Sequence, residues 1–290
     1  MRPHQAFSRR SFLGGAVAAG AAATLAARSA AAADGTLDFP LVDYHVHLDN
    51  STIDKVLPLA AERHVKFGIV EHAGTKENKY PRVLSNDDEL LSFIKGLDGK
   101  GVYRGVQAEW TDWMGCFSPQ ALARLDYVLT DAFTFPGPEG RRHKLWEKEA
   151  EAAIDMSNHE AFMDRFVDWH VQIMATEPID ILANASWLPG PLLPSYDALW
   201  TDRRVQKVVD AALKYKVAIE ISASYQLPRL PFLRQAKQAG AKFSFGSNGR
   251  YPAMGKLDYS IATAQALGLK ASDMFTPAPD GQKAVQRRMK

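Results

Sequence analysis

The sequence predicts an α/β domain built on a parallel sheet, either open or closed into a barrel. Seven apolar stretches of strand length alternate with seven stretches of helical periodicity, and the connections between them are short. Such alternation is typical of parallel sheets. Residues 34–290 are long enough to form one large domain with a substantial core. No internal repeat, low-complexity tract or second domain stands out.

Each predicted strand leads into a predicted helix. The strands are expected at 41–48, 65–72, 102–110, 125–133, 179–186, 216–224 and 242–248. The helices are expected at 53–63, 86–97, 118–123, 158–175, 201–214, 230–239 and 258–267. Gly268 directly follows the last helix, where glycine often ends a helix. Residues 134–157 break the pattern, and we expect a loop there that leads into a helix and could cover one mouth of a barrel.

The first 33 residues are predicted to be an export signal and not part of the domain. Arg9 and Arg10 precede a weakly apolar run at 12–27, and small residues precede Asp34. SRRSFL resembles the bacterial twin-arginine (Tat) signal, whose cargo crosses the membrane already folded. The apolar run is below the ~20 strongly apolar residues that a spanning helix needs. We therefore expect recognition by the Tat export machinery, cleavage after Ala33, a periplasmic or secreted location and no stable membrane anchor.

Charge and cysteine content narrow the classes of function. The chain has 35 Lys and Arg against 33 Asp and Glu, but four arginines and no acid lie in the first 33 residues. The domain after the signal therefore carries 31 basic and 33 acidic residues, a net charge of −2, and we expect no nucleic-acid partner. Cys116 is the only cysteine. An internal disulfide is impossible, which is compatible with folding before export.

Polar side chains that could act as ligands close nearly every predicted strand. In a closed parallel barrel the chemistry gathers at these strand ends, because the loops after the strands converge there. In chain order these residues are His45 and His47, His72, Glu109, Asp131, Asn184, Ser222 and Asn248.

His45 and His47 lie two residues apart at the end of the first predicted strand. Side chains alternate along a strand, so both imidazoles are expected to face one way while Val46 faces the other layer. The pair is either a metal-ligand pair or two hydrogen-bonded core histidines. With His72 and Glu109 at the next two strand ends, it would offer three nitrogens and one oxygen, a set suited to zinc, manganese or iron.

The order of these segments resembles the PHP (polymerase and histidinol phosphatase) family. The segments that carry the resemblance are DYHVHL, GIVEHAG, GVQAEW, LDYVLTDAF, IDILANAS, AIEISAS, QAGAKFSFGSNGR and IATAQALGLKASDMF. The resemblance covers most of 39–275 and implies a PHP-like domain over 34–290, a distorted seven-stranded (β/α)7 TIM-like barrel. Members often bind up to three metal ions and hydrolyse phosphate esters. The resemblance makes His45, His47 and His72 metal ligands and Glu109 a bridging ligand.

The chain departs from the family pattern at four positions. Ala132, Asn184 and Arg250 stand where members have histidine, and Asn248 stands where they have aspartate. Arginine has no lone pair to donate and keeps its charge in proteins. At about 4 Å from a divalent ion it would cost several kcal/mol, even at an effective dielectric near 20. A site with three ions is therefore not expected.

The ligands that remain predict one divalent ion. It would be held by His45, His47 and Glu109, with the side-chain carbonyl oxygen of Asn248 as a further ligand. Two histidines and one carboxylate leave coordination positions open for water.

Two functions follow from these residues. The first is an exported metal-dependent, phosphoesterase-like hydrolase of a small anionic substrate. Asp131 or His72 would handle protons, with Asp131 as the general base, while Arg250 clamps the anion and Asn184 contacts the substrate. The alternative is a non-catalytic PHP-like barrel that binds a small anionic ligand. For Arg250 itself, the alternative to binding an anion is a structural pairing with Glu220 or Asp131 that closes the barrel. An amidohydrolase-type barrel also begins with H-x-H, but no late metal-binding aspartate and only seven units are found.

Overall fold

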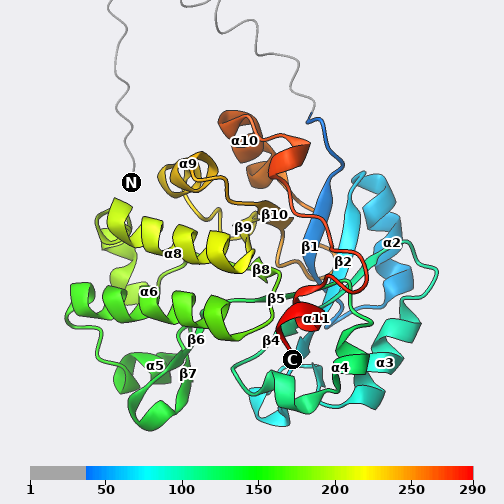
Figure 1. The fold of residues 1–290 in the computed structure, drawn as a ribbon, viewed down its shortest axis with the longest axis horizontal. Coiled ribbons are helices and arrows are strands. Elements are labelled where there is room, and N and C mark those ends of the chain that lie inside the picture. The colour runs from blue at the N-terminus through cyan, green and yellow to red at the C-terminus, as the bar shows by residue number, and fades with distance from the viewer. Residues whose placement is uncertain (1–36, 290) are drawn as a thin grey trace, which may run out of the picture. The chain divides into compact units, whose positions relative to one another are not determined.

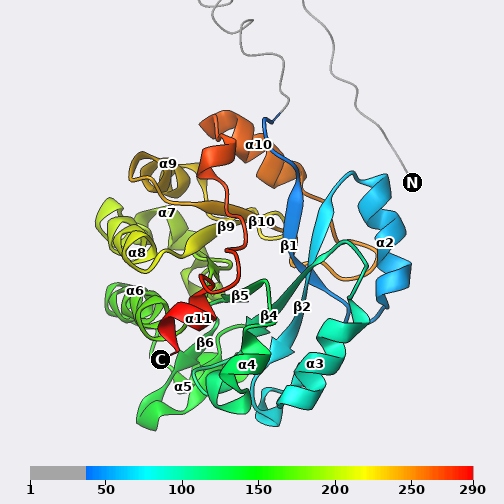
Figure 2. The ribbon, with the colours of Figure 1, turned by 45° about the vertical axis from the view of Figure 1, so that its right-hand side comes forward.

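The computed structural model describes residues 37–289, so the predicted export signal lies outside the described residues. Seven parallel strands form a closed barrel surrounded by helices (Figures 1 and 2). They are β1 (Val42–His47), β2 (Lys66–Ala73), β4 (Tyr103–Ala108), β5 (Tyr127–Thr130), β8 (Ile181–Leu182), β9 (Ala218–Ser222) and β10 (Phe243–Gly246). Their order is β1-β10-β9-β8-β5-β4-β2, and β2 pairs with β1 to close the ring. The predicted α/β barrel and all seven predicted strands are confirmed.

The seven predicted helices are also present. They are α2 (Ile53–Glu62), α3 (Asp87–Gly96), α4 (Pro119–Leu122), α6 (His159–Thr176), α8 (Asp202–Tyr215), α9 (Leu230–Gln238) and α10 (Asp258–Leu267). Four begin at a side chain that accepts a backbone N–H of the first turn, namely Asn86, Ser118, Asn158 and Thr201. Gly268 ends α10 in the left-handed conformation at φ 60°, as predicted. No helix within residues 37–289 is long and apolar enough to cross a bilayer.

Residues 134–157 differ from the expected loop. They form an antiparallel hairpin of β6 (Thr134–Pro136) and β7 (Arg142–Lys144), followed by α5 (Lys148–Ala153). The hairpin is anchored on α6, because Trp169 Nε1 donates a hydrogen bond to the Thr134 carbonyl at 2.9 Å. Phe135 also packs against Phe162, with the ring centroids 5.6 Å apart. The other short elements are β3 (Val83–Leu84), which extends the sheet beside β2, α7 (Tyr196–Leu199) and α11 (Ala284–Arg288).

A small apolar cluster fills one half of the barrel interior. Its members are Val42, Tyr44, Val70, Tyr127, Leu129, Ile181, Ala183 and Ala218. Tyr127 on β5 donates a hydrogen bond to the Tyr44 carbonyl on β1 at 2.7 Å. Because β1 and β5 are not neighbours in the ring, this contact passes through the interior. Gly68 and Gly105 leave room for the Tyr127 ring, which a Cβ at either position would overlap.

The same strands turn polar toward their carboxyl ends. Inward positions alternate along a strand, so the interior series on β5 runs Tyr127, Leu129 and then Asp131. The equivalent polar positions on other strands are His72 after Val70, Gln107 after Gly105, and Glu220 after Ala218. All of these side chains are buried or half-buried. The carboxyl half of the barrel interior is therefore polar, and it positions the site described next.

The chain after β10 seals this end of the barrel against β1. The Gly249 N–H donates to the His45 carbonyl at 3.0 Å, and the His47 N–H donates to the Gly249 carbonyl at 2.9 Å. Residues about 200 positions apart in the chain thus fix the backbone on both sides of Val46, directly before His47.

Candidate metal centre

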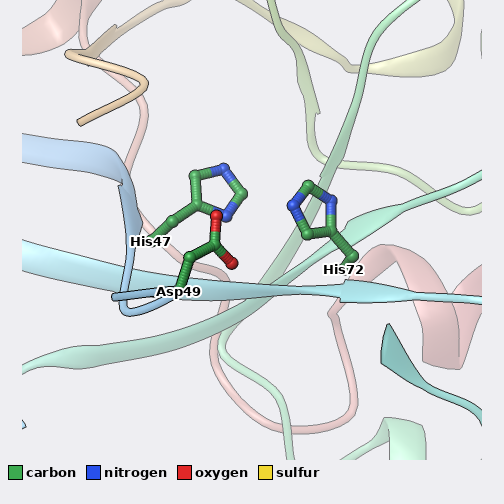
Figure 3. Close-up of side chains that lie close together, drawn as sticks. All are labelled: His47, Asp49 and His72. Atoms are coloured by element: carbon green, nitrogen blue, oxygen red, sulfur yellow. The ribbon is translucent and has the colours of Figure 1, made fainter. Parts of the chain in front are cut away.

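Three side chains at the carboxyl ends of neighbouring strands form a group that could hold a metal ion. They are His47 at the end of β1, Asp49 just beyond it, and His72 near the end of β2. One ligand atom from each lies within 4.8 Å of the others. Figure 3 shows the two imidazole rings facing one another with the Asp49 carboxylate beside them. Two imidazoles and one carboxylate form a ligand set that binds zinc, iron or manganese in proteins.

Several polar atoms in this group are buried without a hydrogen-bond partner. Within residues 37–289 these include both ring nitrogens of His47, Nε2 of His72 and Oδ1 of Asp49. Buried polar atoms in folded proteins nearly always have a partner. Each of the three residues has such an atom, and one ligand atom from each could bind the same ion, so this donor set fits a divalent cation.

Glu109 holds His72 from the side away from the centre. Nδ1 of His72 lies 2.7 Å from Oε1 of Glu109, and the Tyr80 hydroxyl donates to Oε2 of Glu109 at 3.0 Å. The Tyr80 ring stacks on His72 with the centroids 3.7 Å apart and the planes 6° apart. A carboxylate at Nδ1 is the usual way in which a metal-binding histidine is oriented. Glu109, predicted as a ligand, therefore is not one of the candidate ligands but is hydrogen-bonded to one of them, His72.

Burial dominates the ionisation of these groups. It lowers the pKa of His72 to about 3 and the pKa of His47 well below its usual value, with neighbouring imidazoles adding to the effect at His47. Burial also raises the pKa of Glu109 to about 8, with the Tyr80 hydrogen bond and the Lys144 charge acting in the opposite direction. Burial therefore favours the neutral imidazole at His72, the form in which a histidine binds a metal ion.

His45 has partners on both ring nitrogens. Nδ1 lies 2.7 Å from Oε2 of Glu220, and Nε2 lies 3.0 Å from Oε1 of Gln107. Gly246 leaves room for this pair, since a Cβ there would overlap the Glu220 carboxylate. Burial lowers the pKa of His45, but the Glu220 carboxylate outweighs it and the net pKa is raised. The structure thus places His45 in a hydrogen-bonded network and leaves it out of the candidate centre, although both histidines do face the interior.

Arg250 contacts the candidate centre through Asp49. Its Nε donates to Oδ2 of Asp49 at 3.0 Å, and its Nη1 donates to the side-chain oxygen of Asn248 at 2.7 Å. That amide oxygen was predicted as a metal ligand and here accepts from the guanidinium. The structural pairing considered for Arg250, with Glu220 or Asp131, is replaced by the pairing with Asp49. Nη2 of Arg250 makes no hydrogen bond within the part of the chain that the structure describes.

A cavity of about 320 Å³ adjoins the centre. It is lined by His72, Tyr80, Gln107, Asp131, Phe133, Trp146, Tyr225, Asn248 and Arg250. Burial raises the pKa of Asp131 to about 7, and the nearby Glu109 carboxylate adds to this. Asp131 accepts the Phe133 N–H at 2.9 Å. Asp131 and Arg250, both predicted as catalytic, therefore face one cavity.

Asn184, predicted to contact the substrate, does not line this cavity. It is 2% exposed, and its Oδ1 accepts a hydrogen bond from the Ser222 hydroxyl at 2.8 Å. Its backbone adopts the left-handed conformation at φ 51°, which asparagine tolerates better than most residues.

Asp49 was missing from the sequence prediction. It lies two residues beyond the end of β1, outside the strand ends that predict ligands. The sequence signal that could have identified Asp49 is the spacing H-x-H-x-D. In an extended chain the side chains of residues 45, 47 and 49 point to the same side.

The fold and the site together define a closed parallel β/α barrel with a candidate metal centre at the carboxyl ends of its strands. No family model and no curated protein matches the chain. Two solved structures show a distant likeness. One is phospho-2-dehydro-3-deoxyheptonate aldolase (DAHP synthase) from Thermotoga maritima, 11% identical, covering 80% of this chain and 71% of that one, with a TM-score of 0.33. The other is an HpcH/HpaI aldolase from Desulfitobacterium hafniense DCB-2, 12% identical, covering 84% and 95%, also with a TM-score of 0.33.

Proposed function

We propose that this protein is a metal-dependent hydrolase of the phosphoesterase type, with one divalent ion and a small anionic substrate. The observation that carries the proposal is the set of buried, unpartnered ligand atoms on His47, Asp49 and His72. Zinc, manganese and iron suit such a set. The sequence resemblance to the PHP family supports the reaction class.

The ion, when bound, would supply Lewis-acid polarisation of a substrate oxygen and a lowered pKa for water. The chain itself supplies the remaining functions. The guanidinium of Arg250 borders both Asp49 and the cavity, so its free Nη2 edge can bind an anionic oxygen. Asp131 faces the same cavity with a pKa near neutrality, which suits a group that accepts and returns a proton. Glu109 and Tyr80 keep the His72 ring in place.

One observation favours the alternative, a non-catalytic barrel that binds a small anionic ligand. Arg250 already bonds to Asp49, one of the three candidate ligands, and partly neutralises it. In such a barrel Arg250 would bind the ligand's anion and no ion would be needed.

The proposal also places the protein outside the cytoplasm. SRRSFL and the small residues before Asp34 support Tat-dependent export to the periplasm or medium. The net negative charge of the remaining domain gives no support to nucleic-acid binding.

The metal content of the purified protein tests the proposal. We expect elemental analysis to find about one divalent ion per chain, and we expect His47→Ala and His72→Ala each to lose it because each removes one of three ligands. His170→Gln is the matched control, since His170 is also buried but sits on α6 with Nδ1 bonded to the Phe166 carbonyl. This control should retain the ion.

Two results would contradict the hydrolase. A chain that takes up no zinc, manganese or iron under any loading condition would contradict the hydrolase and favour the alternative, a non-catalytic barrel that binds a small anionic ligand. A metal-loaded chain that hydrolyses neither phosphate monoesters nor diesters would remove the reaction class. A His45→Gln variant separates the two ligand sets, because it should keep the ion only if His45 is outside the centre.

A further inference from the structure

The cavity beside the candidate centre has a polar side and an aromatic side. The polar side is formed by His72, Gln107, Asp131, Asn248 and Arg250, and the aromatic side by Tyr80, Phe133, Trp146 and Tyr225. Two of the rings reach solvent, since Trp146 is 45% exposed and Tyr225 is 41% exposed. Within residues 37–289 only three large aromatic side chains are exposed to this degree, and two of them line this cavity.

The rings on the aromatic side of the cavity pack against one another. Phe133, which is 6% exposed, is at their centre. The Phe133 ring centroid lies 5.8 Å from that of Trp146 and 6.0 Å from that of Tyr225, with the planes 65° and 83° apart. Phe133 also contacts Trp187, with the ring centroids 4.4 Å apart. These contacts support the exposed rings of Trp146 and Tyr225 beside the cavity, where they can stack on a flat ligand.

Positive charge lies close to these rings. Nζ of Lys144 is 4.0 Å from the Tyr80 ring centroid and 5.5 Å from that of Trp146, and it donates to the Asn78 carbonyl at 2.7 Å. Arg250 brings a second cation to the polar side, 36% exposed at its side chain. Asp131 is the single acid among the residues that line the cavity. The cavity therefore pairs flat apolar surface with a site for an anion at Arg250, and Lys144 adds positive charge next to its lining.

The size of the cavity limits the ligand. A volume of about 320 Å³ is at the lower end of the roughly 300–1000 Å³ found for small-molecule sites. It suits a molecule of one or two rings that carries one anionic group, and it excludes a long polymer from full enclosure.

From this juxtaposition we propose that the substrate is a small aryl anion. Its aromatic ring stacks against Trp146 and Tyr225 while its phosphate-like group bonds to Arg250 beside the metal centre. The identity of the compound as a substrate rests on the proposed function, but its recognition does not depend on turnover. Stacking on exposed rings favours a flat aromatic group over an alkyl chain that carries the same anion.

Binding of phenylphosphonate and methylphosphonate to the full chain tests this proposal. Both compounds carry the same anion, and their P–C bond is not a phosphate ester, so binding is measured without turnover. We expect isothermal titration to show phenylphosphonate bound about tenfold more tightly, as burial and stacking of one ring predict.

Variants of the two exposed aromatic residues test whether they cause the preference for phenylphosphonate. Trp146→Leu and Tyr225→Leu should each reduce the preference for phenylphosphonate several-fold, while Trp146→Phe, which keeps a ring, should retain most of it. Tyr251→Leu is the matched control, because Tyr251 is also 41% exposed but does not line the cavity, although it directly follows Arg250. It should bind both compounds as the unchanged chain does.

Equal affinity for the two phosphonates, or binding of neither, would overturn the proposal. So would a preference that survives both Trp146→Leu and Tyr225→Leu. Failure of the hydrolase gives a different result. If phenyl phosphate is not hydrolysed while the ring preference and its loss in the variants are observed, the aryl site stands and the hydrolase does not.

Discussion

At the residue scale, Glu109 decides how firmly the candidate centre is held. It bonds to Nδ1 of His72 and accepts from the Tyr80 hydroxyl, and it is 4% exposed. A buried carboxylate in this position orients the imidazole without being a ligand itself. Its loss would free the His72 ring to rotate and would leave Nδ1 without a partner.

We therefore predict that Glu109→Ala weakens binding of the ion by about 10–100-fold, measured by competition with a chelator of known affinity. Glu109→Gln is the matched variant, because its amide oxygen can still accept from Nδ1 of His72. It should lose much less affinity than Glu109→Ala. If both variants lose the ion to the same extent, Glu109 is a direct ligand, as the sequence alone suggested.

The sequence could identify the ligand types at this site but not their final partners. His45 and His47 are equivalent in a sequence pattern, yet only His45 meets the Glu220 carboxylate, which comes from a strand 175 residues later. That contact occupies one of the two imidazoles and leaves the other for an ion. Asp49 escaped prediction because it lies past the end of its strand, where burial cannot be inferred from periodicity.

At the element scale, the residue that ends α6 is a buried carboxyl group whose charge depends on pH. Glu177 is the residue that follows the helix, is 2% exposed, and accepts a hydrogen bond from Trp113 Nε1 at 2.9 Å. Burial raises its pKa to about 7, although the Trp113 hydrogen bond and the Arg288 charge act in the opposite direction. The folded chain therefore keeps a proton at Glu177 where the unfolded chain has released it.

This difference gives the stability a pH dependence of known sign. Between about pH 4.5 and 7 the folded state binds more protons at Glu177 than the unfolded state, so its contribution to the free energy of unfolding falls as pH rises. We predict that Glu177→Gln, which stays neutral, makes the chain more stable than the unchanged protein by about 1–3 kcal/mol above pH 7. Near pH 4 the two should unfold alike.

Urea denaturation at a series of pH values measures this effect. Glu151→Gln, at an exposed position on α5, is the control and should follow the unchanged protein at every pH. A Glu177→Gln chain that loses stability at pH 8 would show that the carboxylate is ionised and stabilising in the fold.

Most elements were predictable because their local patterns agree with the fold. The seven strands are short apolar runs closed by polar residues, and helices such as α8 start at a capping threonine. The hairpin of β6 and β7 was not predictable, since its strands are three residues each and RHK has no apolar face. It is held by Trp169 and Phe162 on α6, contacts that no local pattern specifies.

At the scale of the whole molecule, the proposed export signal would act on a chain that folds into a barrel. The domain needs no disulfide, as Cys116 is the only cysteine. Such a domain can fold completely before it crosses a membrane, which is what Tat export requires of its cargo.

We predict that Arg9→Lys together with Arg10→Lys retains the precursor in the cytoplasm, because the pair is the feature that the export machinery recognises in a signal of this type. Cell fractionation and immunoblotting compare the location and size of the protein. Arg28→Lys, which lies in the same segment but outside SRRSFL, is the control and should leave export intact. Export of the double variant at the normal level would argue against the Tat route.

The pairing of β1 with β10 has a consequence for when the protein can fold during its synthesis. The strand made first can complete its hydrogen bonds only with a strand made some 200 residues later, and Gly249 then bonds to the backbone on both sides of Val46. Contacts so distant in sequence make folding slow. Until β10 has been translated, the barrel cannot close, and the candidate metal ligands cannot reach their final positions. An ion that binds at the candidate centre would therefore be captured late, in the finished and released polypeptide, and the compartment in which folding ends would decide which metal the protein first meets.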